Sequence, residues 1–305
     1  MRLWWTTLLV LIALGGAGLA AAADRPQNSL HRPELTWRAD QKADPWIAAL
    51  AHELKIVDGH IVGLSRHGRD VLGGITALDV ERMNDALDAG DQVSLELEVA
   101  LGRLASVRAA AQAAVDESRL GAPTRSIFDQ LTSAAASGQQ LTAAWQGLGA
   151  DARRVAGLID ALLRHDGLVF RATTAGRAAN WEDALSLLQE AQASLAEATE
   201  IRNGLALRLN TDTLDDLLAR YRAYDAALTA LYTYIRDTGR TEGADFDSLE
   251  AAVDRAQAAL PADTSAMSVI VAEAAGPPLT DGLLAMERVR GVILEALTAA
   301  ASSQP

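Results

Sequence analysis

The chain has 305 residues, of which 50% are hydrophobic, 22% are charged and 4% are aromatic, and its formal net charge is −13. Because nucleic acids and anionic lipids attract surplus cations, a chain this acidic is not expected to bind either one by its charge. The absence of cysteine excludes disulfides, covalent c-type haem, a thiol nucleophile and lipoprotein acylation.

The first 23 residues have the parts of a secretory signal peptide. Arg2 precedes a short apolar run (3–14), and an Ala-x-Ala site at 21–23 is followed by a polar residue. We therefore expect cleavage of 1–23 and export of the protein, to the periplasm or the extracellular space. The alternative is an uncleaved anchor, since this apolar segment is just long enough to span a bilayer. The membrane would then be contacted only through this segment.

Residues 24–43 contain two prolines and scattered charges without periodicity. This composition predicts a flexible tether in front of a folded part at 44–302. Asp44 and Pro45 predict the start of the first helix, as the N-cap and the first helical residue.

The helical signals that follow are regular, because the apolar residues are mostly Ala and Leu, which favour helix over strand. The first helix is expected to end at Gly73–Gly74. Thr76 with Asp79 resembles a capping box and starts a second helix that extends to about Ser118, with a potential interruption at 89–91.

The most regular pattern in the chain lies between Ile127 and Val169. Its members recur at steps of four and three, and only one of them is charged: Ile127, Leu131, Ala134, Gly138, Leu141, Trp145, Leu148, Ala152, Val155, Ile159, Leu162, Asp166 and Val169. We call this set the apolar seam. The pattern is typical of a long helix that packs lengthwise against partner helices. One continuous helix of this length would extend roughly 60 Å.

Further helices are predicted from Trp181, over 214–235, over 246–260 and over 280–300, with breaks at 210–213 and at Gly276-Pro277-Pro278. The polar turn near 173–180 is the place where a sub-division of the bundle would fall. The expected fold class is all-α, a long antiparallel helical bundle or coiled-coil-like array of about six to eight helices.

Residues 170–195 align without gaps on residues 235–260. Two explanations stay open: a duplicated helix–loop–helix unit, or a chance match in an Ala-rich helical chain.

Four tyrosines, Tyr221, Tyr224, Tyr232 and Tyr234, lie close together in one predicted helix. Tyrosines of this kind can line a groove for a small molecule or a peptide, and they are the candidate ligand-binding residues. The alternative is that they pack at helix interfaces with the hydroxyl in water.

Three histidines, His52, His60 and His67, lie in the first predicted helix and are the candidate metal ligands. Two ligands for one ion from one helix need a spacing of three or four residues, which these histidines lack. A metal or haem site would therefore need partners from another helix, such as Met83 or His165. The alternative is that these histidines are solvated, and no cofactor is expected.

The sequence contains no nucleophile elbow, Walker loop, dinucleotide fingerprint, HExxH motif or EF-hand loop. We therefore expect that the protein is not an enzyme. The function hypothesis is an exported, non-catalytic interaction or scaffold module of the cell envelope, which binds a protein partner or a second copy of itself. The alternative is an extracytoplasmic helical bundle that senses a ligand or binds a small molecule or metal.

Overall fold

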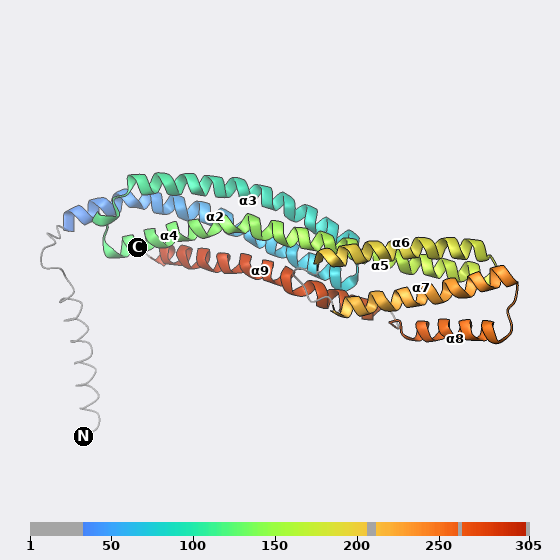
Figure 1. Ribbon diagram of the computed structural model, residues 1–305. Coiled ribbons are helices and arrows are strands. Elements are labelled where there is room, and N and C mark those ends of the chain that lie inside the picture. The colour runs from blue at the N-terminus through green and yellow to red at the C-terminus, as the bar shows by residue number, and fades with distance from the viewer. Residues whose placement is uncertain (1–32, 206–211, 262–263, 303–305) are drawn as a thin grey trace, which may run out of the picture.

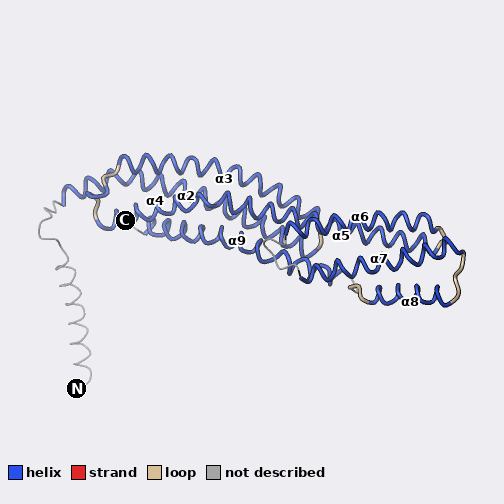
Figure 2. Tube along the Cα trace, in the orientation of Figure 1, coloured by secondary structure: helices blue, strands red, loops and turns tan. Residues whose placement is uncertain are grey.

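The computed structural model describes residues 33–205, 212–261 and 264–302, which form an elongated molecule of helices lying lengthwise along one another (Figure 1). Within these ranges the chain forms eight α-helices and two short 3-10 helices, and no strand. The prediction of an all-α array is therefore confirmed. Figure 2 shows that the loops are short connections between helix ends. The predicted signal segment, 1–23, lies outside the described residues.

One end of the molecule, here called the long-helix half, is built by the longest helices (Figure 1). It consists of α2 (Pro33–Ala77), α3 (Val80–Ala114), α4 (Ala122–Ser137), α9 (Thr264–Ser302) and the first part of α5 (Leu141–Arg177). The short 3-10 helices η1 (Glu117–Arg119) and η2 (Gly138–Gln140) connect α3 to α4 and α4 to α5.

The other end, here called the distal half, is built around the last part of α5. It adds α6 (Trp181–Leu205), α7 (Asp212–Thr238) and α8 (Ala244–Ala258), which follow one another in the chain and pack lengthwise, α6 on α7 and α7 on α8 (Figure 1). The turn at 178–180 lies at the far tip of this half. The two apolar core clusters meet within α5, between Leu162 and Leu168.

Residues 33–43, predicted as part of a flexible tether, instead form the first turns of α2, and Pro45 lies inside that helix and not at its start. Two contacts with the rest of the fold explain this difference. Ala43 is fully buried, and the Asp40 carboxylate accepts a hydrogen bond of 2.9 Å from the backbone N–H of Gly121. Tertiary packing therefore outweighs the local cost of an internal proline.

The start of α3 also differs from its prediction. Asp79 is itself the N-cap, and its side chain accepts a hydrogen bond from the backbone N–H of Arg82. The expected interruption at 89–91 is continuous helix, because Gly90 lets the ring of Trp145 on α5 approach the α3 backbone. A Cβ atom at position 90 would lie 2.0 Å from Cζ2 of that ring.

The apolar seam is buried from Ile127 to Val169, with Asp166 as its one partly exposed member. The prediction of a single helix over this stretch is wrong, because η2 divides it into α4 and α5. Gly138, the first residue of η2, is pressed against Leu101, so that a Cβ there would lie 2.9 Å from Leu101 Cδ2.

Near the C-terminus, the break predicted at 276–278 is absent, and α9 runs through this stretch as one helix. The predicted break at 210–213 lies partly outside the described residues, and α7 begins at Asp212. The two segments of the internal alignment both form a helix, a turn and a second helix. Duplication stays a prediction.

Candidate functional site

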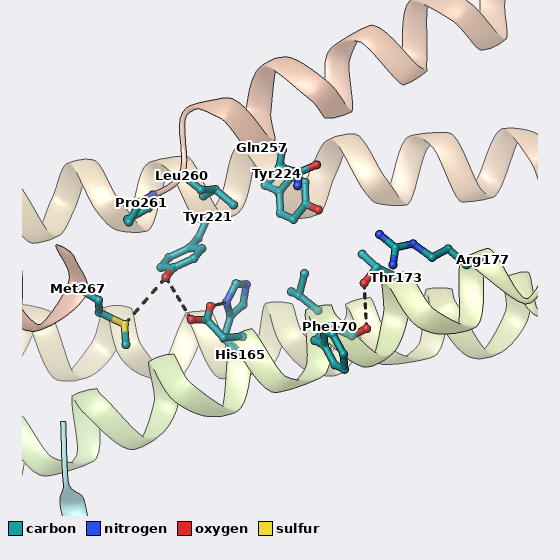
Figure 3. Close-up of a pocket in the computed structure, with 12 residues that line it drawn as sticks. His165, Phe170, Thr173, Arg177, Tyr221, Tyr224, Gln257, Leu260, Pro261 and Met267 are labelled. Carbon is teal, nitrogen blue, oxygen red and sulfur yellow. Dashed lines mark hydrogen bonds and ion pairs between the residues drawn. The ribbon is translucent and has the colours of Figure 1, made fainter. Parts of the chain in front are cut away.

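The distal half contains a cavity of about 410 Å³ between α5 and α7. Figure 3 shows α5 and α7 on its two sides, with Leu260 and Pro261 from the connection between α8 and α9, and Met267 from α9, at one end. Residues from four helical elements therefore meet here, although α8 packs mainly against α7 and buries only one residue, Val253.

A buried histidine forms one wall of this cavity. His165 on α5 is 1% exposed, and its Nε2 atom lies 3.1 Å from Oδ2 and 3.2 Å from Oδ1 of Asp225 on α7, which is also 1% exposed. Its Nδ1 atom lies 3.2 Å from Oδ1 of Asp166. As an imidazolium, His165 donates one hydrogen bond to each carboxylate, so both ring nitrogens are in use.

Tyr221 extends this network towards the cavity. Its hydroxyl donates to Oδ2 of Asp166 at 3.4 Å and lies 4.0 Å from the sulfur of Met267. Its ring packs edge-on against the His165 ring, with centroids 4.7 Å apart. His165, Asp166, Asp225 and Tyr221 therefore form one connected polar cluster, here called the His165 cluster.

The pKa shifts in this cluster follow from burial and from its two carboxylates. Burial alone lowers the pKa of His165, but its hydrogen bonds to Asp166 and Asp225 and their charges outweigh burial and raise the pKa to about 9. Burial, reinforced by the negative charge of Asp166, raises the pKa of Tyr221. At neutral pH the cluster holds one imidazolium, two carboxylates and a neutral phenol, and so carries one excess negative charge.

The opposite end of the cavity is cationic. Arg177 lies in the last turn of α5 and lines the cavity together with Thr173, Tyr224 and Gln257. The pKa of Tyr224 is raised, because the effect of burial is larger than the opposing effect of the nearby Arg177 guanidinium. Among the residues that the structure describes, no carboxylate is paired with Arg177.

The structure separates the four candidate tyrosines. Tyr221 and Tyr224 line the cavity, whereas Tyr232 and Tyr234 do not. Tyr232 packs on Trp181, with ring centroids 5.6 Å apart, and lies so close to Gly176 that a Cβ there would be 2.6 Å from its Cζ atom. Tyr232 is therefore a packing residue at the tip of the distal half, and Tyr234 is half-buried on the same helix.

The candidate metal ligands all lie on α2, in the long-helix half. His52 is exposed, His60 lies 3.8 Å from Glu96 and His67 is half-buried. Across the described ranges, no group of three or more His, Asp or Glu side chains is arranged to hold a metal ion. Burial, followed by the charge of Arg66, lowers the pKa of His67.

Sequence reasoning named His165 only as a partner for another histidine and did not single out Asp225. One signal was present: Asp166 is the single charged member of the apolar seam, and it lies beside His165. A charge on a buried helix face indicates a polar partner or a cavity. Asp225, the partner of His165 on α7, is 60 residues away from His165 in the chain, so no local pattern reveals this pair.

Asp225 borders a second cavity of about 340 Å³, which is lined by residues of α6 and α7. Arg222, Glu200 and Gln192 line this space, and Arg222 donates a hydrogen bond to the Thr199 hydroxyl. The pair of His165 and Asp225 therefore lies between the two cavities, because His165 lines the first and Asp225 lines the second.

No protein-family model, curated protein or solved structure matches this chain in the comparisons made. None of the described helices is both long and apolar enough to cross a membrane.

Proposed function

We propose that this chain is an exported helical-bundle protein that binds a small molecule in the cavity between α5 and α7. The observation that carries the proposal is the cavity itself, with the buried His165 cluster in one wall. Its volume lies in the range of small-molecule sites, and it combines aromatic walls with a few fixed polar groups, as such sites do.

Binding is favoured over catalysis because of the way His165 is held. Both ring nitrogens of His165 are bonded to carboxylates, and its side chain is 1% exposed. A general base needs a free nitrogen within hydrogen-bond reach of a substrate proton. We therefore propose that the His165 cluster gives the cavity wall its shape and its charge. The protein is then not catalytic.

A thermal-shift screen of metabolites tests this proposal. A ligand at 100 times its Kd should stabilise the protein by about 2.7 kcal/mol. Phe170 lines the cavity and is 72% exposed, so Phe170→Ala should abolish the shift without changing the melting temperature of the free protein.

The matched control is Leu163→Ala on the same helix, because Leu163 is also an exposed apolar residue (37%) but does not line the cavity. This variant should keep the ligand-induced shift. A library without any stabilising compound, or a shift that Phe170→Ala leaves intact, would contradict the proposal.

A second candidate function is an interaction or scaffold module of the cell envelope. It is supported by the elongated shape of the molecule (Figure 1). It is also supported by Leu95 and Val99 on α3, which are 60% and 61% exposed and lie one helical turn apart. An apolar pair on one exposed helix face is suited to contact with another protein or a second copy. Native mass measurement and crosslinking of the purified protein, with the double variant Leu95→Gln and Val99→Gln as comparison, test it. An assembly that the double variant dissociates is expected, and a monomer without a crosslinked partner would contradict it.

Export is proposed from the N-terminal sequence features alone. N-terminal sequencing of the protein recovered outside the cytoplasmic membrane should find Asp24 as the first residue. Recovery in the membrane with residues 1–23 intact would favour the anchored alternative.

A further inference from the structure

The cavity between α5 and α7 has opposite charges at its two ends. At one end, the His165 cluster holds two carboxylates, Asp166 and Asp225, against one imidazolium. Of these carboxylates, Asp166 lines the cavity and its side chain is 37% exposed, whereas Asp225 is buried. The excess negative charge is therefore presented to a ligand through Asp166.

At the other end, the guanidinium of Arg177 is the available cation. Figure 3 shows it beside Thr173 and on the side of the cavity that faces Tyr224, away from His165 and Tyr221. Within the described ranges Arg177 takes part in no ion pair. A guanidinium without a protein partner can bind a carboxylate through two parallel hydrogen bonds. The hydroxyl of Tyr224 and the amide of Gln257 line the same end and can add further hydrogen bonds.

The distance between the two ends limits the size of the ligand. Asp166 and Arg177 are eleven residues apart on one helix, which corresponds to about 16 Å between their Cα atoms. Both side chains reach into the cavity between these two positions. The two charges of a ligand therefore need to be closer together than the two Cα atoms are. Between them the wall is apolar and aromatic, because Phe170 and Val169 lie on α5 and the Tyr221 and Tyr224 rings lie on α7.

We propose that the cavity binds a zwitterion whose protonated amine and carboxylate are separated by a spacer, namely a short peptide of two to four residues with free ends. Its amino terminus would lie at Asp166 and Tyr221, and its carboxyl terminus at Arg177. An extended peptide covers about 3.4 Å per residue, which matches this range of lengths. A free α-amino acid carries both charges on one carbon and can reach only one end. This inference rests on the proposed ligand-binding function and names the chemical class of the ligand.

Calorimetric titration of the full chain with four Ala-X-Ala tripeptides, in which X is Leu, Phe, Ser or Gln, tests the inference. At least one free tripeptide should bind. Its N-acetylated form and its C-terminal amide should each bind at least tenfold more weakly, because each loses one of the two charges. Free leucine should bind at least tenfold more weakly as well.

Two charge-removing variants assign each end. Arg177→Gln should remove the preference for the free acid over the amide and leave the penalty for acetylation unchanged. Asp166→Asn should have the opposite pattern. Arg171→Gln is the matched control, since Arg171 is an exposed arginine on the same helix that does not line the cavity.

Several results would overturn the peptide assignment: no binding of any of the four tripeptides, affinity that is insensitive to both blocked ends, or an acid-to-amide ratio that Arg177→Gln does not change. If the tripeptides fail but another compound stabilises the protein and loses its effect in Phe170→Ala, the proposed function stands and only the peptide assignment falls. If no compound acts through the cavity, both fall.

Discussion

The long-helix half and the distal half of this molecule bury different chemistry. The core of the long-helix half is dominated by fully buried aliphatic side chains such as Leu50, Leu54 and Ile61, with Trp145 and Phe128 as its largest members. The distal half has a much smaller apolar cluster, and next to it lies the buried ion pair of His165 and Asp225. Two cavities border this pair.

Under the proposed function, this difference gives the two halves different roles. A buried ion pair stabilises a fold less well than apolar packing of the same volume, so its presence favours a role beyond stability. The long-helix half is packed mainly by aliphatic side chains along its length. The distal half has less apolar packing and contains instead a charged wall and two cavities, one of which is the proposed ligand site.

Asp225→Asn in the distal half is expected to cause the largest loss of stability. The change leaves the buried imidazolium of His165 with only one of its two carboxylates, and removing one partner of a buried pair typically costs about 3 kcal/mol or more. Urea denaturation at pH 6.5 measures the loss. The control is Asp216→Asn on the same helix, because its pair with Arg220 is exposed and should contribute less than about 1 kcal/mol. Equal losses of stability in the two variants would show that the buried pair stabilises the fold no more than the exposed pair does.

The stability of the protein should also depend on pH through His165. The pKa of His165 is raised from 6.5 to about 9 in the folded state, so the folded state holds this proton more tightly than the unfolded chain. The resulting stabilisation is fully present below pH 6.5 and is lost as the pH rises through 9. It amounts to on the order of 3 kcal/mol.

Denaturation between pH 6 and pH 10 measures this dependence. The groups that face His165 are Asp166 on its own helix and Asp225 and Tyr221 on α7, so Asp225→Asn should flatten the curve. A stability that is constant over this range, or that increases with pH, would contradict the charge state assigned to the His165 cluster.

A smaller loss is expected when the packing of the long-helix half is disturbed. Gly90→Ala places a methyl group against the Trp145 ring, and overpacking of this kind costs about 2 kcal/mol. Gly102→Ala is the matched control on the same helix, because open space surrounds position 102 and alanine is the better helix former by up to about 1 kcal/mol. Thermal unfolding should therefore move in opposite directions for the two variants. A shared direction would contradict the close approach of α3 and α5.

The smallest loss of stability is expected from Tyr221→Phe. This change removes a hydroxyl that donates to Asp166 over 3.4 Å, which is a long hydrogen bond, so the loss should be about 1 kcal/mol or less. Ligand affinity should fall more than stability does, since Tyr221 lines the cavity and its hydroxyl holds Asp166. Thermal unfolding and calorimetric titration of the same variant measure both quantities, and an unchanged affinity would remove Tyr221 from the site.

The fold was predictable from the sequence where one helix packs against its neighbours along its whole length. The steps of four and three from Ile127 to Val169 identified a buried face correctly. They did not reveal η2 at Gly138, because a short 3-10 segment changes the backbone hydrogen bonds without changing the spacing of apolar residues. The helical state of 33–43 was missed for a different reason, since it depends on the contact of Asp40 with Gly121, far along the chain.

The site was predictable only in part. Clustering in one helix indicated Tyr221 and Tyr224, but the same reasoning included Tyr232 and Tyr234, which do not line the cavity. Tyr232 packs against Trp181 instead. The pair of His165 and Asp225 could not be derived, because it exists only once α5 and α7 lie side by side. Long-range packing of this kind leaves no spacing rule in the sequence.

In the proposed function, the distal half holds the ligand and the long-helix half does not. Hydrogen exchange of the full chain, with and without the compound that raises its melting temperature most, tests this claim directly. We predict added protection in residues 165–177 and 221–225, and unchanged exchange in α2 and α3. Protection that appears along α2 and α3 instead, or that is absent from residues 165–177, would contradict it.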